Sequence, residues 1–266
     1  MARVAETRSR GASRSVAGGS RTASESVAGE SRAESETVAG VSRTDGRRER
    51  GRRTRASILA TAVDIASVEG LEGLTIGRLA AELRMSKSGL FAHFGSKEEL
   101  QLAAIDAARE IFIARVAEPA RATERGLPRL RALLDAKLAY LRDEAFRGGC
   151  FFDAARIEYD SRPTGPVRDA IVKQTDDWLE HLSARIHAAQ EEGHVDPDVE
   201  PDQLAFEIDA LQSAANVNYQ LRRDAGVFDR VQRAIEARLG SVTLAPLPAA
   251  RPRARRGPAR DRRARS

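Results

Sequence analysis

Apolar side chains recur at the spacing of an α-helix through most of the chain between residues 50 and 240. The first stripe places them at i, i+4, i+7 and i+8, at Ile58, Ala62, Ile65 and Ala66. Gly70 follows this stripe where a helix C-terminal cap is expected. No alternating apolar run bounded by hairpin signals occurs in the sequence. The pattern therefore predicts an all-α fold.

The expected long helices follow one another with short connections. Pro128, Pro166 and Pro201 each stand where a proline can occupy the first turn of a helix. Together with the apolar spacing they predict helices near residues 50–69, 96–118, 128–145, 150–160, 166–193, 201–223 and 227–240. The folded part of the chain is expected to end near Val242.

The two ends of the chain have compositions that do not support a packed core. Residues 1–46 repeat an imperfect 11-residue unit, Val16–Arg21, Val27–Arg32 and Val38–Arg43, with few large apolar residues. Such a chain cannot bury enough surface to offset roughly 1–2 kcal/mol of backbone entropy per residue. Residues 1–46 are therefore predicted to be disordered, and they can in addition be an extension upstream of the true translation start. Residues 244–266 place four prolines among arginines and are predicted to form a disordered basic tail.

The net charge of +5 is unevenly distributed. Residues 47–105 carry +3 and residues 251–266 carry +7, whereas residues 106–250 carry −6. A basic segment near each end of an acidic body favours a protein that binds phosphates with its ends. On charge alone, an arginine-rich tail can equally be a solvated spacer.

Several classes of protein are excluded by what the sequence lacks. No run approaches the ~18 apolar residues that a membrane span needs, and the N-terminus lacks the apolar core of a secretory signal. Cys150 is the only cysteine, which excludes a disulfide framework and a multi-cysteine zinc site. No glycine-rich phosphate loop, Gly-x-Ser-x-Gly elbow or His-x-x-x-His pair is present. We expect a soluble, cytoplasmic protein that is not an enzyme and that holds no cofactor or metal.

Residues 75–94 form the pattern of two short helices joined by a tight turn. Thr75 is a good N-cap for the first helix, and Ser86 is a good N-cap for the second, after a break at Arg84. Apolar residues mark one inward face on each helix: Ile76, Leu79, Ala80 and Leu83, then Leu90 and Phe94. A second helix with a polar start is the arrangement of a helix-turn-helix, whose second helix enters the major groove.

The stretch from Thr54 to Ala104 resembles the tetracycline-repressor (TetR) family of bacterial regulators, most specifically over Met85–Leu100. This resemblance implies a three-helix DNA-binding head, here residues 47–105, and a body of about six helices for ligand binding and dimerisation, residues 106–243. It also implies a homodimer that reads a palindromic operator in double-stranded DNA. By position, phosphate contacts are implied for Thr75, Phe91, His93 and Lys97, and proximity to base edges for Lys87, Ser88 and Gly89. Ser86 completes the expected DNA-binding set.

Two positions depart from the family pattern. Phe91 stands where many members have tyrosine, so a hydroxyl–phosphate bond is lost there. Arg84 stands where many members have glycine or asparagine, so a left-handed backbone at the turn would cost about 1 kcal/mol.

Each of these residues also has a plainer interpretation. Lys97 can be a solvated residue of a helix's first turn, and His93 can be a capping or packing residue. Phe91 and Phe94 are interpreted as core residues rather than as wedges between bases. The arginine run can be the solvated start of a helix or an electrostatic contact to DNA; it comprises Arg47, Arg48, Arg50, Arg52, Arg53 and Arg55.

The last two predicted helices carry apolar stripes at helical spacing. These are Leu204, Ile208, Leu211 and Ala215, then Phe228, Val231, Ile235 and Leu239. Two such helices from each chain can form a four-helix bundle across a twofold axis. The alternative is that both stripes face the core of a single chain. The resemblance favours the dimer.

Residues 147–169 resemble a C-terminal type found in one branch of the family, at the place where members line an effector pocket. Cys150, Phe151, Phe152, Trp178, Phe206 and Tyr219 are candidates for apolar walls, and Asp209, Gln212 and Asn216 for polar groups that orient a ligand. For all of them a role in the core is the alternative. The Cys150 thiol can be a sensor or an inert buried group.

The sequence therefore predicts a transcription regulator, most simply a repressor that a small-molecule effector releases from its operator. One alternative is a nucleoid-type or scaffolding protein that binds DNA without sequence preference through its basic tails. An activator built on the same scaffold is another.

Overall fold

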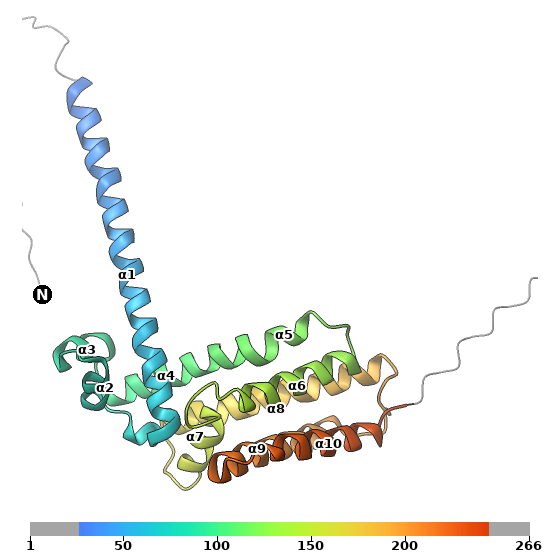
Figure 1. Cartoon of the computed structure of the whole chain (residues 1–266). Helices are drawn as coiled ribbons and strands as arrows, with labels where there is room; N and C mark the ends of the chain where they lie inside the picture. The colour runs from blue at the N-terminus through green and yellow to red at the C-terminus, as the bar shows by residue number, and fades with distance from the viewer. Residues whose placement is uncertain (1–26, 245–266) are drawn as a thin grey trace, which may run out of the picture. The chain divides into compact units, whose positions relative to one another are not determined.

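The structure is a computed structural model that describes residues 27–244, and residues 1–26 and 245–266 lie outside the described part (Figure 1). The chain divides into two units, Met1–Arg53 and Thr54–Ser266. Helices account for the regular structure of the described residues, in the order α1 (Val27–Gly73), α2 (Ile76–Leu83), α3 (Lys87–Phe94), α4 (Lys97–Phe112), the π-helical turn η1 (Ile113–Ala117), α5 (Glu118–Arg121), α6 (Leu127–Arg142), α7 (Phe151–Tyr159), α8 (Pro166–Glu191), α9 (Pro201–Arg222) and α10 (Gly226–Gly240). An isolated bridge pairs Val195 with Thr243. The all-α prediction is confirmed.

Residues 27–46 are helical in the structure, where the sequence predicted a disordered segment. Alanine, glutamate and arginine supply eight of these twenty residues, and such residues add helical hydrogen bonds at little cost once one turn exists. Further along α1, the guanidinium groups of Arg52 and Arg53 both donate hydrogen bonds to the carboxylate of Glu49. The predicted disorder of residues 1–26 and of the basic tail falls outside the described residues.

Three helices and the start of a fourth form the predicted head around one small core. Ile58 and Ala62 of α1, Leu79 of α2, and Leu90 and Phe94 of α3 are all buried. The predicted inward faces of the two short helices are therefore correct. α4 begins directly after this head and runs into the body, where it packs against α8.

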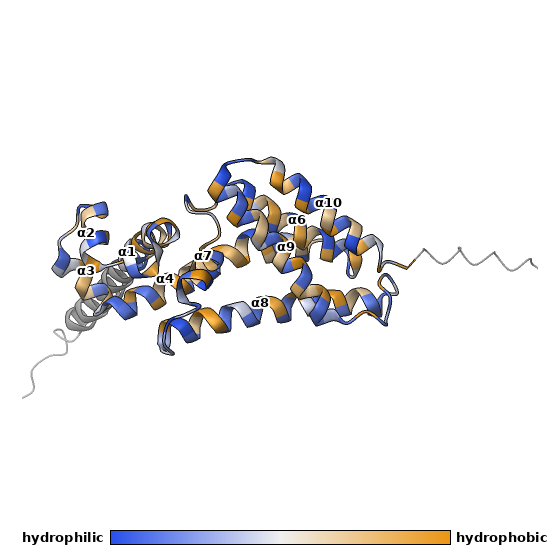
Figure 2. Ribbon diagram, turned by 90° about the horizontal axis from the view of Figure 1, so that it is seen from below, coloured by the Kyte–Doolittle hydropathy of each residue, from blue (hydrophilic) through white to orange (hydrophobic). Residues whose placement is uncertain are grey.

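The body is built from α4, α6, α7, α8, α9 and α10. α8 packs on α9, α9 packs on α10, and α6 packs on α8. Figure 2 shows apolar and polar residues alternating around these helices, as expected of amphipathic elements that each bury one face. None of the described helices is long and apolar enough to span a membrane.

The two apolar stripes predicted to form a dimer bundle lie in the core of the single chain. Leu204, Ile208 and Ala215 of α9 are fully buried, and Leu211 is half-buried. The α10 stripe, Phe228, Val231, Ile235 and Leu239, is buried as well. The dimer interpretation of these stripes was wrong, because α9 and α10 use them to pack on each other and on α6.

Candidate nucleic-acid interface and ligand cavity

The turn between α2 and α3 is fixed by local hydrogen bonds. The Thr75 hydroxyl accepts from the Arg78 amide at 3.0 Å, and the Ser86 hydroxyl accepts from the Gly89 amide at 3.1 Å. Arg84 takes the left-handed conformation at φ 52°, and Met85 then donates to the Ala80 carbonyl. Arginine at this position carries the strain that the sequence indicated, about 1 kcal/mol. The arrangement is a helix-turn-helix.

The outward face of α3 presents polar and apolar side chains together. Lys87 and Ser88 are exposed at its start, and Gly89 is partly exposed. Phe91 is 57% exposed, whereas Phe94 is buried. The core interpretation was therefore correct for Phe94 and wrong for Phe91, because Phe94 shares a helix face with Leu90 and Phe91 does not.

Arg55 of α1 holds α3 in place. Its guanidinium donates to the His93 carbonyl at 2.6 Å and lies 4.5 Å from the centroid of the Phe94 ring. This member of the arginine run thus has a structural partner inside the head. The half-buried His93 ring lies 6.2 Å from the Phe94 ring, so His93 contributes to packing.

Lys97, a predicted phosphate contact, forms an ion pair with Glu72 at 2.8 Å. The Glu72 carboxylate also accepts from the Tyr159 hydroxyl at 3.1 Å and lies 3.5 Å from the Arg162 guanidinium. The hydrogen bond from Lys97 lowers the pKa of Glu72 below its ordinary value. Glu72 is therefore charged at neutral pH and links the start of α4 to the end of α7.

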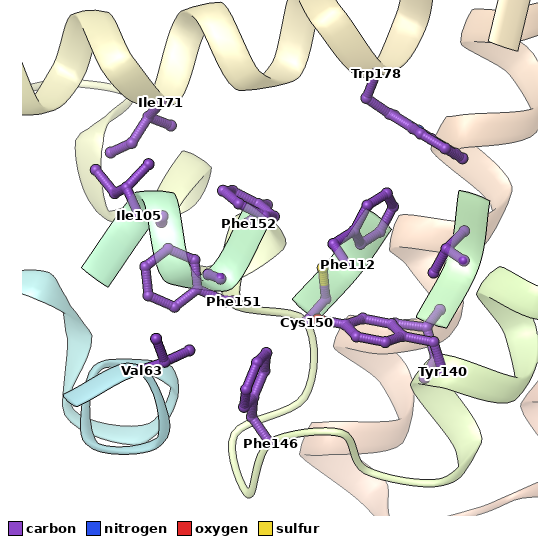
Figure 3. Packing of buried hydrophobic residues seen from close by; sticks show 14 of the residues in the cluster. Val63, Ile105, Phe112, Tyr140, Phe146, Cys150, Phe151, Phe152, Ile171 and Trp178 are labelled. Atoms are coloured by element: carbon purple, nitrogen blue, oxygen red, sulfur yellow. The ribbon is translucent and has the colours of Figure 1, made fainter. Parts of the chain in front are cut away.

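A small cavity lies in the body between α4, α6, α7, α8 and α9. Its walls are Phe112, Lys137, Cys150, Phe152, Asp153, Arg156, Gln174, Thr175, Trp178 and Asp209, and it encloses about 20 Å³. Figure 3 shows the rings of Phe112 and Phe152 beside the Cys150 thiol, with Trp178 facing them from α8. The Phe112 ring stands edge-on to Trp178 at 5.0 Å and to Phe152 at 6.2 Å between centroids.

Four charged side chains form one network along the cavity wall. Lys137 pairs with Asp209 at 2.8 Å, and Arg156 bridges Asp209 at 3.0 Å to Asp153. The Trp178 indole also donates to Asp209 at 2.9 Å. Burial raises the pKa of Asp209, but the two cations outweigh it and bring that pKa to about 2. The network thus holds two cations and two carboxylates in balance, as buried charges require.

The structure brings four of the predicted ligand residues together at this cavity: Cys150, Phe152, Trp178 and Asp209. Burial raises the pKa of the Cys150 thiol to about 12, which favours its interpretation as an inert group.

The other predicted ligand residues do not line the cavity. Gln212 donates to the Leu134 carbonyl, Asn216 accepts from the Cys150 amide, and Tyr219 packs against the ring of Phe228. Phe151 is buried beside Phe152, and Phe206 is exposed on α9.

Sequence reasoning missed six wall residues, namely Phe112, Lys137, Asp153, Arg156, Gln174 and Thr175. One signal was available for Lys137. It lies next to Leu138 and one turn after Leu133 and Leu134, so a charge falls inside the apolar stripe of its helix. A lysine in that position indicates a buried anionic partner.

The fold and the turn geometry define the class of protein: an all-helical transcription regulator with a helix-turn-helix head. Two family models match the chain, the bacterial regulatory proteins of the tetR family over residues 58–104 and the tetracyclin repressor-like C-terminal domain over residues 126–235. The chain belongs to the TetR family. Members of this family are DNA-binding transcription regulators and not enzymes.

Individual relatives agree with this assignment. The HTH-type transcriptional regulator TcmR of Streptomyces glaucescens is 27% identical over 197 residues, which cover 74% of this chain and 85% of that protein. A TetR transcriptional regulator from Chloroflexus aurantiacus matches at 28% identity with a TM-score of 0.68, covering 74% of this chain and all of that one. A transcriptional regulator from Saccharomonospora viridis, solved in complex with choline, shares the fold at 23% identity and a TM-score of 0.59, covering 73% and 99%.

Proposed function

We propose that this protein is a homodimeric repressor that binds a palindromic operator through α3 and is released when a small molecule enters the cavity of the body. The observation that carries the proposal is the course of α4. Lys97 begins this helix beside the helix-turn-helix, and Phe112 ends it in the cavity wall. Sixteen residues at about 1.5 Å each place these two ends about 24 Å apart along one rigid element.

An effector can act on α4 because the wall side chains leave little free space in the cavity. A volume of about 20 Å³ holds about one water molecule, so a ligand must displace a wall residue. Phe112 is followed directly by the π-helical turn η1, and such turns inside α-helices are frequent at functional sites. A ligand that binds better to the displaced state lowers DNA affinity by the same factor by which DNA lowers ligand affinity. The choline-bound neighbour supports the idea that this fold admits a small molecule.

On the DNA side, the start of α3 supplies the expected base contacts. Lys87 and Ser88 are exposed there, and Gly89 allows close approach. Thr75, His93 and Lys97 flank these residues and are expected to contact phosphates, as the resemblance implies. Phe91 has no hydroxyl and can offer only apolar contact. A bacterial regulator that binds DNA is expected to work in the cytoplasm.

The dimer requires a surface other than the buried stripes. α9 carries a second apolar stripe on its outward side, with Phe206, Val217 and Leu221 exposed and small alanines at positions 210 and 214 between them. The exposed Ile157 of α7 belongs to the same hollow as Phe206 and Val217. We assign this face to a second copy of the chain, because a twofold axis is needed to place two α3 helices on half-sites about 34 Å apart.

The test is binding of the purified protein to the DNA upstream of its own gene, at two salt concentrations. Lys87→Ala should remove sequence-specific binding. Deletion of residues 245–266 should only reduce the salt dependence. Lys173→Ala, which removes an exposed α8 lysine paired with Asp177, serves as the matched control.

Two outcomes would reject the proposal in favour of its alternatives. Binding that ignores DNA sequence and disappears with the tail would indicate a scaffolding protein. Specific binding that raises transcription in a reconstituted assay would indicate an activator.

A further inference from the structure

We propose that the effector cavity takes an uncharged aromatic molecule that carries a hydrogen-bond donor, and that Asp153 accepts this hydrogen bond. The inference rests on the proposed function, because it names the ligand class for the same cavity. Three observations carry it: a buried acceptor atom without a donor, a balanced set of charges, and walls of aromatic rings.

The first observation is an unused oxygen of Asp153. This residue is 3% exposed, and its Oδ1 atom accepts from the Ser213 hydroxyl at 3.0 Å and from the Arg156 guanidinium. Its Oδ2 atom is buried and has no hydrogen-bond partner among residues 27–244. A buried carboxylate oxygen without a donor is unfavourable, and hydrogen bonds to charged groups are among the stronger ones in proteins. Because Asp153 lines the cavity, an occupant with an O–H or N–H group is favoured.

The second observation concerns charge. The two cations, Lys137 and Arg156, are already paired with the two carboxylates of the network. A further cation would be repelled by the Lys137 ammonium. This ammonium lies 4.7 Å from the centroid of the Trp178 ring and so already occupies the position over the ring that a ligand cation would take. An anion would meet Asp153 and Asp209. Beside this network an additional charge of either sign is left uncompensated, so a neutral group is favoured at this place in the cavity.

The third observation concerns the shape and the composition of the walls. Phe112, Phe152 and Trp178 stand edge to face, which is the packing that an added aromatic ring can extend. A second hollow of about 160 Å³ opens to the surface beyond Phe112 and Trp178, and these two residues and Gln174 line both spaces. Its outer side is polar and carries Arg109, Arg121, Asp177 and His181. By volume alone, a space of about 150 Å³ is large enough for benzene. Displacement of Phe112 would therefore open room for a molecule of one or two rings whose donor reaches Asp153.

The test uses calorimetric titration of the full chain with three related probes. These are 2-naphthol, which has a donor; 2-methoxynaphthalene, which has only an acceptor; and 2-naphthoate, which is an anion. We expect 2-naphthol to bind at least tenfold more tightly than either of the others, since hydrogen bonds to charged groups are among the stronger ones in proteins. Quenching of Trp178, the only tryptophan, would place the bound probe at the cavity.

The Asp153→Asn variant separates a specific hydrogen bond from general apolar affinity. An asparagine amide can turn its N–H toward the ligand, so the preference for 2-naphthol over 2-methoxynaphthalene should shrink at least tenfold. Asp176→Asn, an exposed change on α8, should leave the preference unchanged. If Asp153→Asn does not fold, as judged by thermal melting, the ranking of the three probes in the wild type decides the question.

Several outcomes would overturn the inference. Equal affinity for the naphthol and its methyl ether, tightest binding of the naphthoate, or no binding of any probe would each do so. An unchanged preference in a folded Asp153→Asn variant would remove the role of Asp153. Operator binding is measured in parallel without any probe, so specific DNA binding beside one of these results would leave the proposed function standing.

Discussion

The carboxylate of Glu158 accepts hydrogen bonds from the backbone amides of Leu71, at 2.7 Å, and Glu72, at 2.9 Å. These two amides directly follow the break in α1 at Gly70. Gly70 makes this approach possible, because it lies at φ 77° and a Cβ atom there would stand 2.7 Å from Glu158 Oε2. Glu158 belongs to α7, which also supplies Asp153 and Arg156 to the cavity wall. One short helix therefore contacts both the head and the cavity.

Glu158→Gln should destabilise the protein by about 1–3 kcal/mol, because the neutral amide keeps only one oxygen for two backbone donors. The midpoint of unfolding in urea should fall accordingly. Glu180→Gln, on an exposed part of α8, is the matched control and should leave the midpoint unchanged. Equal midpoints for the two variants would mean that the Glu158 bonds contribute nothing measurable.

Lys97 is expected to leave Glu72 when DNA is bound. Lys97→Ala should weaken operator binding and lower the salt slope by about one unit, because one phosphate contact is lost. Glu72→Gln should act in the opposite direction, since it removes a carboxylate beside the phosphates and releases Lys97. Both effects are measured by titrating operator DNA over a range of salt concentrations. A salt slope unaltered in Lys97→Ala would show that this lysine does not contact DNA.

The helix-turn-helix was predictable from the sequence because its determinants are local. Thr75 and Ser86 mark helix starts through their own side chains, and the left-handed Arg84 follows from the break between two short apolar stripes. The outward direction of Phe91 was equally local. Phe91 follows Leu90 by one residue and therefore points away from the face that Leu90 and Phe94 share, which indicates exposure. The prediction that it is buried relied on the general preference of phenylalanine for the core.

The cavity and the dimer face were less predictable because they depend on which side of a helix meets its neighbours. α9 has apolar residues on two sides, and spacing alone does not say whether the stripe of Leu204 and Ile208 or that of Phe206 and Val217 is buried. Likewise, Asp153 and Arg156 lie on α7 among apolar residues, and nothing in their own spacing indicates that they are paired. Their partners, Asp209 and Ser213, come from α9 and are far away in the sequence.

The α9 face makes a prediction about assembly. Leu221 is 78% exposed in the single chain, so Leu221→Asp should not disturb its core. In the dimer that we propose, two copies of the new carboxylate would be buried in or beside the interface, which is strongly unfavourable. Sedimentation should then show a monomer with an unchanged helical spectrum and operator affinity lowered at least tenfold. Arg233→Asp, on the exposed side of α10, is the control, and a dimeric Leu221→Asp protein would refute the assignment.

Cys150 should be unreactive in the native protein. It is the only cysteine, it is buried, and burial raises its pKa to about 12, so the thiolate population at pH 8 is negligible. Iodoacetamide should label the unfolded chain and leave the native chain unlabelled over the same time. Rapid labelling of the native protein would restore the sensor interpretation.

Asp209 makes the stability of the body depend on acid. Its pKa in the folded protein is about 2, below the ordinary 3.8, because Lys137 and Arg156 outweigh the effect of burial. A carboxylate whose pKa is lowered by folding stabilises the fold fully above about pH 4. This contribution is lost as the carboxylate is protonated between about pH 4 and about pH 2. The loss should amount to about 2 kcal/mol of unfolding free energy.

Asp209→Asn tests this linkage through urea unfolding at a series of pH values. At neutral pH the variant should be about 3–5 kcal/mol less stable, since Lys137 is left buried without its carboxylate. Between pH 4 and pH 2, however, it should lose about 2 kcal/mol less stability than the wild type. The double variant Lys137→Met/Asp209→Leu should recover most of the neutral-pH stability, because apolar groups then replace both charges. If the wild type and Asp209→Asn lost stability in parallel below pH 4, the acid dependence would belong to other carboxylates.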